Sequence, residues 1–260
     1  RCQPVTGVQT CALPISIPCN LASVLYNKTE GKIRLAAINT LGVLYVVETG
    51  DSVQSVADLK GKTIFATGKG ATPEVVLRTV LTKNGIDPDK DVTIEFKSEA
   101  TEVAALMKNA GDAAIAMLPQ PFVTAAAMQN DKIRVALDMT KEWNAVSDGK
   151  DLITGCVAIR ADVVKKKAEK VAAFMADYAA SVQFVQENAG EAAKLIEEYS
   201  IVPKAAIAEK ALPACNIVFI DGEKMKTLAE SYFELLFEFD PKTVGGKLPA
   251  EDFYYLPAAK

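Results

Sequence analysis

The stretch SVADLKGKTIFATGKGAT, residues 55–72, carries a helix signal, a strand signal and a glycine-rich loop in direct succession. Ser55–Leu59 is predicted as a short helix, and the β-rich run Thr63–Thr67 as a strand. The loop Gly68–Pro73 then opens the predicted helix Glu74–Asn84, with proline at the position that helices tolerate best near their start. This part of the chain is therefore predicted to form a strand that runs through a tight loop into a helix N-terminus.

The same alternation of strands and helices extends along most of the chain. Strands separated by helices of about ten residues are typical of βαβ units with parallel strands, which build α/β layers. From Ala161 onward the pattern is almost wholly helical. Further strands are predicted at Ile33–Ile38, Gly42–Glu48, Val92–Phe96, Asp112–Leu118, Ile133–Leu137 and Leu152–Ile159. Further helices are predicted at Leu21–Lys28, Glu99–Asn109 after an N-cap at Ser98, Phe122–Gln129, Ala161–Glu187, Ala189–Tyr199, Lys204–Leu212 and Glu223–Phe239.

Composition excludes several classes of protein. The chain has 260 residues, of which 50% are hydrophobic and 24% charged, and it contains no histidine. It therefore cannot hold a Ser-His-Asp or Cys-His nucleophile, a histidine zinc site or an imidazole general base. The net charge of −4 comes from interspersed residues of both signs, without the basic stripe that nucleic acid requires. No catalytic residue, metal site or cofactor is predicted.

One internal repeat indicates two equivalent halves. Pro18-Cys19-Asn20 leads through a helix to the triplet Lys32-Ile33-Arg34, and Pro119-Gln120-Pro121 leads through a similar helix to Lys132-Ile133-Arg134. The prolines are 101 positions apart and the triplets 100. Coincidence is the alternative, since a triplet can match by chance. A structural repeat would mean two α/β lobes, each with a polar loop between a strand and a helix, where open α/β sheets bind ligands.

The first residues are interpreted as foreign to the protein. Val5–Ser16, VTGVQTCALPIS, resembles the translation of a sequencing-library adapter. The alternative, the end of a secretory leader, is disfavoured because the apolar stretch is short and contains a proline. We therefore expect residues 1–16 to be an artefact and the natural sequence to begin near Ile17.

The remaining cysteines and the single tryptophan are interpreted as packing residues. Cys19, Cys156 and Cys215 are an odd number at wide spacing, which predicts neither a disulfide framework nor a metal site. They are expected to be small buried apolar residues. Trp143 is expected to pack in the core or on the surface rather than to stack on a ligand.

Three segments are similar to one family of proteins: residues 55–72, the strand and loop GDAAIAMLPQP at 111–121, and the helical tail. From about Ile17 to Tyr255 the chain resembles the solute-binding proteins of ABC importers, in the type-2 periplasmic-binding branch that includes sulfonate-, nitrate- and thiamine-precursor-binding members. The resemblance implies a bilobal α/β fold with a cleft between two lobes that are joined by two crossovers.

The resemblance also implies where the lobes divide. Lobe two would span residues 41–153, and lobe one residues 17–40 and 154–260, with Asn39-Thr40 and Thr154-Gly155 as the hinge. Relatives carry a signal sequence, in many cases with a lipobox cysteine, and a first β-α-β unit that this sequence lacks. Lobe one is therefore expected to be incomplete and the chain to be a fragment.

The predicted ligand-binding residues lie at strand-to-helix loops and at the crossover. Gly70, Ala71 and Thr72 combine backbone amides at a helix N-terminus with a hydroxyl donor, which favours a small anionic or polar group. An ordinary helix cap is the alternative, and the spacing is wrong for a nucleotide-binding loop. The other predicted contacts, each with a plain turn, cap or hinge role as its alternative, are Gln120, Asn20 from the opposite lobe, Asn39 and Thr40.

The function that the resemblance implies is capture of a small anion or zwitterion by an extracytoplasmic, monomeric protein, periplasmic or at the cell surface. Its partners would be the ABC permease and ATPase subunits, with no nucleic acid, and it would reach the membrane through the permease or a lipid anchor. An enzyme of thiamine-pyrimidine synthesis on the same fold is one alternative, although its histidine and Cys-rich motif are absent here. A ligand-sensing effector domain of a transcription regulator is the other.

Overall fold

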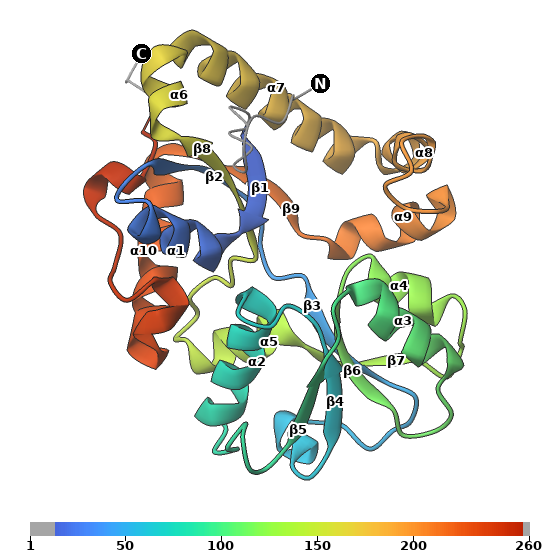
Figure 1. The fold of residues 1–260 in the computed structure, drawn as a ribbon. Coiled ribbons are helices and arrows are strands. Elements are labelled where there is room, and N and C mark those ends of the chain that lie inside the picture. The colour runs from blue at the N-terminus through green and yellow to red at the C-terminus, as the bar shows by residue number, and fades with distance from the viewer. Residues whose placement is uncertain (1–13, 257–260) are drawn as a thin grey trace, which may run out of the picture.

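The protein folds around two separate β-sheets, drawn one above the other in Figure 1. The structure, a computed structural model, describes residues 14–256, so most of the segment predicted to be foreign lies outside the described residues. We call the sheets with their helices the four-stranded lobe and the five-stranded lobe. The first sheet has the order β1 (Ile15–Pro18), β8 (Gly155–Arg160), β2 (Ile33–Thr40) and β9 (Ile217–Ile220). The second has the order β5 (Thr93–Phe96), β4 (Thr63–Ala66), β6 (Ile115–Pro119), β3 (Leu44–Glu48) and β7 (Arg134–Asp138).

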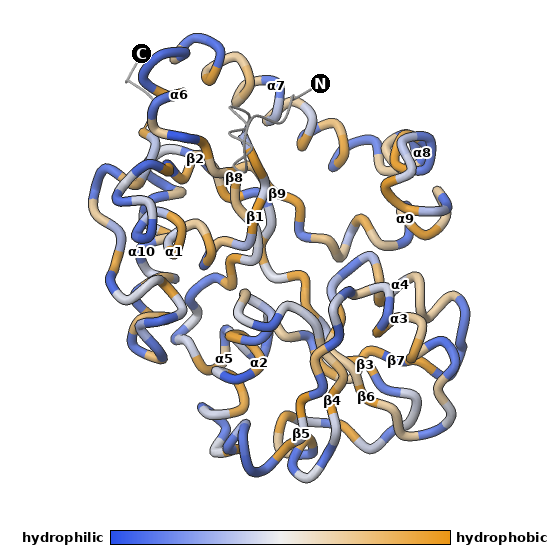
Figure 2. Tube along the Cα trace, viewed as in Figure 1, coloured by the Kyte–Doolittle hydropathy of each residue, from blue (hydrophilic) through white to orange (hydrophobic). Residues whose placement is uncertain are grey.

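Helices cover both faces of the four-stranded sheet (Figure 1). Successive side chains of a strand point to opposite faces, so Leu35 of β2 packs in the cluster that includes α1 and α10, whereas Ala36 packs with α6 and α7. Figure 2 shows hydrophobic and hydrophilic residues alternating along α7, which buries Val171, Met175 and Val182 on one face. The elements of this lobe besides its strands are α1 (Cys19–Lys28), α6 (Ala161–Lys166), α7 (Ala168–Glu187), α8 (Ala189–Glu198), α9 (Ala205–Ala211), α10 (Gly222–Phe239) and the 3₁₀ turns Leu212–Ala214, Pro241–Val244 and Glu251–Phe253.

The five-stranded sheet is covered in the same way. Val46 of β3 packs in the cluster that includes α2 and α5, and its neighbour Val47 packs with α3 and α4. Each lobe is therefore a three-layer arrangement of helices, sheet and helices. The elements of this lobe besides its strands are the 3₁₀ turn Val56–Leu59, α2 (Thr72–Lys83), α3 (Ala100–Asn109), α4 (Phe122–Ala127) and α5 (Met139–Val146).

The expectation of parallel sheets is wrong for the four-stranded sheet, in which every neighbouring pair is antiparallel. It is correct for β5, β4 and β6 of the five-stranded sheet. β8 lies between β1 and β2 and is antiparallel to both, and β3 lies between β6 and β7 in the same way. β1–α1–β2 and β6–α4–β7 are βαβ units whose strands run in the same direction, each with one antiparallel strand inserted. The inserted strands are the ones that enter from the other lobe, so the internal repeat is present in the topology.

Several predicted elements differ from the observed ones. The C-terminal part contains the strand β9, and the helix expected over Ala161–Glu187 is interrupted at Lys167, where the backbone leaves helical geometry between α6 and α7. The helix α5 was not predicted. Ser98 does not cap α3, because Glu99 occupies the N-cap position and the Ser98 N–H donates to the Glu102 carboxylate at 3.1 Å.

One apolar core extends through both lobes. It joins α1 and α10 of the four-stranded lobe to α2 and α5 of the five-stranded lobe. At its centre Trp143 of α5, which is fully buried, packs against Tyr232 of α10 with ring centroids 5.9 Å apart. Trp143 is thus a core residue, one of the two packing roles expected, and it packs across the boundary between the lobes.

Replacing this tryptophan tests whether the lobes share a core. We expect Trp143→Ala to lower the free energy of unfolding by about 3–5 kcal/mol, the usual loss for truncating a buried large aromatic side chain. Urea unfolding followed by circular dichroism measures the change. Tyr199→Ala is the matched control, because Tyr199 is 72% exposed and its loss should change stability by about 0.5 kcal/mol or less. A loss for Trp143→Ala no larger than that of the control would contradict the shared core.

Candidate functional site

The chain passes between the lobes at two places that lie side by side. We call residues 40–44 the first crossing and residues 146–155 the second crossing. The Thr154 N–H donates to the Thr40 carbonyl at 3.0 Å, and the Cys19 N–H donates to the Thr154 carbonyl at 3.1 Å. The start of α1 and both crossings are therefore held together by backbone hydrogen bonds.

Asn39 and Thr40 use their side chains within the protein. Asn39 is buried, and its Nδ2 donates to Ser16 Oγ at 2.7 Å and to the Tyr178 hydroxyl at 3.1 Å. Thr40 Oγ1 donates to Asn39 Oδ1 at 3.2 Å. Both residues therefore brace the end of β2 where the chain leaves the sheet. The partners Ser16 and Tyr178 had no signal in the sequence.

Two predicted residues from opposite lobes are bonded to each other. Thr72 Oγ1 donates to Asn20 Oδ1 at 3.0 Å, and both residues are fully buried. Asn20 Nδ2 donates to the Thr243 carbonyl at 3.3 Å, which connects the same group to the turn after α10. Thr72 is the first residue of α2, where the amides of the first turn lack helical partners and the helix dipole favours negative charge.

The loop before α2 supplies fewer free amides than its sequence predicts. The Gly70 N–H donates to Glu74 Oε2 at 2.6 Å, and the Ala71 N–H donates to the Gly68 carbonyl at 3.0 Å. Gly70 has a φ of 77°, a left-handed conformation that glycine adopts readily. The carboxylate of Glu74 already fills part of the anion-binding role of this loop.

Gln120 mainly serves the helix that follows it. Its Oε1 accepts hydrogen bonds from the Thr124 N–H at 3.2 Å and from Thr124 Oγ1 at 2.9 Å, as an N-terminal capping group does. Its own N–H donates to the Val43 carbonyl at 3.1 Å, which places Gln120 beside the first crossing. Among residues 14–256 the Gln120 Nε2 has no protein partner, so it can donate to a ligand.

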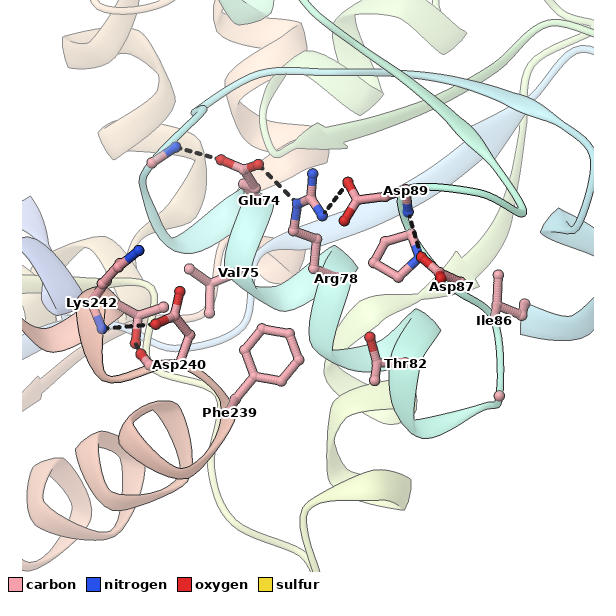
Figure 3. A pocket seen from close by; sticks show the side chains of 14 residues that line it. Glu74, Val75, Arg78, Thr82, Ile86, Asp87, Asp89, Phe239, Asp240 and Lys242 are labelled. Carbon is pink, nitrogen blue, oxygen red and sulfur yellow. Dashed lines mark hydrogen bonds and ion pairs between the residues drawn. The ribbon is translucent and has the colours of Figure 1, made fainter.

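A groove of about 830 Å³ lies between the lobes on the outer side of α2 (Figure 3). Gly70 is the predicted residue that lines it. Arg78 lies on the five-stranded side of the groove and is bonded there to Glu74 at 2.9 Å and to Asp89 at 3.0 Å. The spacing of Glu74 and Arg78 is the i,i+4 signal that could have indicated this pair. The turn after α10 lines the other side of the groove with Asp240, Lys242 and Thr243. The tertiary structure alone places this turn opposite Glu74 and Arg78.

Comparison with known proteins identifies the family. The profile of a family described as NMT1/THI5 like matches residues 33–192, more than half of the chain. The chain belongs to the NMT1/THI5-like family. A comparison with curated proteins finds no match.

Several solved structures resemble this NMT1/THI5-like protein. An ABC transporter from Parabacteroides distasonis is 25% identical with a TM-score of 0.74, over 93% of this chain and 80% of its own. The alkanesulfonate-binding protein SsuA from Xanthomonas axonopodis pv. citri, bound to MOPS, is 15% identical with a TM-score of 0.71, over 94% and 80%. The periplasmic nitrate-binding protein NrtA from Synechocystis PCC 6803 is 15% identical with a TM-score of 0.52, over 71% and 50%. The predicted type-2 periplasmic-binding fold is confirmed.

Residues 14–256 of the NMT1/THI5-like chain contain neither a helix that could span a membrane nor a metal-binding cluster of acidic and cysteine side chains. None of the helices described there is long and apolar enough to cross a membrane. The same residues contain no group of three or more cysteine, aspartate or glutamate side chains arranged to hold a metal ion.

The second crossing has space only for glycine at residue 155. A Cβ atom there would lie 2.6 Å from Asn39 Oδ1 and 3.1 Å from Thr40 Oγ1. We expect Gly155→Ala to lower the free energy of unfolding by about 1–3 kcal/mol, because both side chains must leave their hydrogen bonds. Urea unfolding measures the loss.

Gly190→Ala is the matched control for this substitution. Gly190 lies in α8, and a Cβ atom added there would meet only the flexible Glu209 Oε1, at 3.5 Å. Alanine at this position should raise the free energy of unfolding by up to about 1 kcal/mol. Equal stability changes for the two variants would contradict the close approach at the crossing.

Proposed function

We propose that this protein is the extracytoplasmic solute-binding component of an ABC importer, and that it captures a small anionic or zwitterionic ligand between the two lobes. The observation that carries the proposal is the buried hydrogen bond from Thr72 to Asn20, which joins the lobes at a helix N-terminus. Two comparisons support the proposal. The chain belongs to the NMT1/THI5-like family, and its fold resembles those of an ABC transporter protein, an alkanesulfonate-binding protein and a nitrate-binding protein.

The proposed mechanism is a closure of the lobes that the ligand stabilises. The first turn of α2 offers amides and the Thr72 hydroxyl, which an anionic oxygen accepts in place of Asn20 Oδ1. Asn20 then contacts the ligand from the opposite lobe, and Ala71 and Gln120 complete the site. A ligand that contacts both lobes only when they are closed shifts the protein to the closed state.

The other predicted residues have supporting roles in this proposal. Asn39 and Thr40 brace the first crossing, so they act on the ligand chiefly by setting the hinge. Gly70 gives the loop the turn that brings Ala71 and Thr72 to the start of α2. The lobe boundaries proposed are residues 17–40 with 154–260, and 41–153.

The proposed partners and location follow from the same assignment. The closed, ligand-bound form would dock as a monomer on the permease, which works with an ATPase subunit. The protein would act outside the cytoplasm, in the periplasm or attached to the cell surface by a lipid anchor. We propose no catalytic activity: the NMT1/THI5-like family includes enzymes, but this chain has no histidine to serve as a base or metal ligand.

The site is tested with two buried threonines of one helix. Thr72 is hydrogen-bonded across the lobes, whereas Thr79 is equally buried and its hydroxyl has no partner among the described residues. We expect Thr72→Val to weaken ligand binding about 10- to 100-fold, since a charge-assisted hydrogen bond is lost, and Thr79→Val to bind as the unchanged protein does.

Binding is measured by calorimetric titration. The full-length protein is titrated with methanesulfonate, with nitrate and with a thiamine-precursor pyrimidine. Binding of one of these ligands that Thr72→Val leaves intact would reject the site. Absence of binding by all three in the unchanged protein would reject the ligand class.

A further inference from the structure

Two cysteines that are far apart in the sequence are neighbours in the four-stranded lobe. Cys19 is the first residue of α1, directly after β1, and Cys156 is the second residue of β8. The pairing of β1 with β8 sets Ile17 opposite Cys156 and Pro18 opposite Gly155, and the Cys19 N–H donates to the Thr154 carbonyl at 3.1 Å. Both residues are fully buried free cysteines, and they belong to the same apolar cluster.

We propose that Cys19 and Cys156 form a disulfide bond when the chain folds in the presence of an oxidant of the disulfide class. The inference rests on the extracytoplasmic location proposed above, because structural disulfides form and persist in oxidising compartments. It goes beyond the proposed function, since it concerns a covalent link that ligand binding does not require.

The reaction is a two-step exchange in which atoms and electrons balance. The thiolate of one cysteine, after losing its proton to solvent, attacks a sulfur of the oxidant and releases one reduced thiol, leaving a mixed disulfide. The second cysteine attacks that mixed disulfide and releases the other thiol. The two cysteines are oxidised by two electrons, and the oxidant, a small-molecule or protein disulfide, is reduced to two thiols.

The burial of the pair determines when the exchange can occur. Burial raises the pKa of Cys19 well above its usual value, with its contact to Cys156 adding to the shift. The reactive thiolate is therefore scarce in the folded protein, and an external disulfide cannot reach the pair. The link should form during folding and resist reduction afterwards.

The third cysteine of the described residues is an internal reference. Cys215 lies two residues before β9, the strand at the opposite edge of the sheet from β1, and is half-buried. Burial raises its pKa to about 11. Because it lies at the opposite edge of the sheet from β1, Cys215 should remain a free thiol under conditions that link Cys19 to Cys156.

The link would tie together the chain on either side of the five-stranded lobe. Cys19 precedes both crossings and Cys156 follows them, so the loop that the disulfide closes contains the whole five-stranded sheet. Closing a long loop restricts the unfolded chain strongly. Cys19 also precedes Asn20, so the link would hold Asn20 in the position from which it meets Thr72.

The experiment uses the full chain with Cys2→Ser and Cys11→Ser, so that three cysteines remain. The reduced, denatured protein is refolded with glutathione disulfide, free thiols are blocked with iodoacetamide, and peptides are identified by mass spectrometry. We expect one blocked cysteine, Cys215, and one linked pair of peptides that contain Cys19 and Cys156. A Cys215→Ser version should form the same link, and Cys19→Ser should not.

The outcomes separate this proposal from the proposed function. Three blocked cysteines, or a link that includes Cys215, would overturn it, and neither result depends on whether Cys19→Ser folds. Protein refolded without the oxidant should melt about 10 °C below the linked protein, and Cys19→Ser should melt at the same temperature whether or not the oxidant is present. A linked protein that binds no ligand counts against the function alone, whereas an unlinked protein that binds ligand counts against the disulfide alone.

Discussion

The backbone hydrogen bond from the Thr154 N–H to the Thr40 carbonyl holds the two passages of the chain between the sheets next to each other. Its surroundings leave little freedom, because Gly155 lies against the side chains of Asn39 and Thr40, and Cys19 is bonded to Thr154. The start of α1, the end of β2 and the start of β8 therefore share one rigid junction. The direction of β8 in its sheet and the position of Asn20 both depend on it.

The junction also explains why the two sheets resemble each other. Each sheet receives one strand from the other side of a crossing, and this strand runs against its two neighbours. The βαβ unit on either side then ends its first strand at a proline, Pro18 or Pro119, and begins a helix at the same edge. Polar side chains at the two helix starts thereby come close to the crossings.

Local signals predicted the elements that depend on nearby residues. The strand at Thr63, the loop before Thr72 and the helix α2 follow from glycine, proline and apolar spacing within a short stretch. Elements that depend on distant partners were missed or wrongly bounded. The short strand β9 exists because β2 offers it an edge, and α7 begins anew at Ala168 because its apolar face must meet the sheet. The Glu74 carboxylate also took an amide that the loop sequence alone left free.

The residue types present rule out histidine-dependent centres within these 260 residues, and neighbouring residues set the local shape of the candidate site. Because the chain has no histidine, several catalytic and metal centres are excluded whatever its fold. The loop before α2 needs only its own residues to begin a helix. Which distant side chains meet is visible only in the three-dimensional fold. Asn20 is bonded to Thr72, Trp143 packs on Tyr232, and Cys19 lies in the same buried cluster as Cys156. The spacing of the cysteines had predicted no disulfide. The physical reason is that strand pairing across the crossings sets these contacts, and pairing between strands far apart in the sequence leaves no periodic signal in either one.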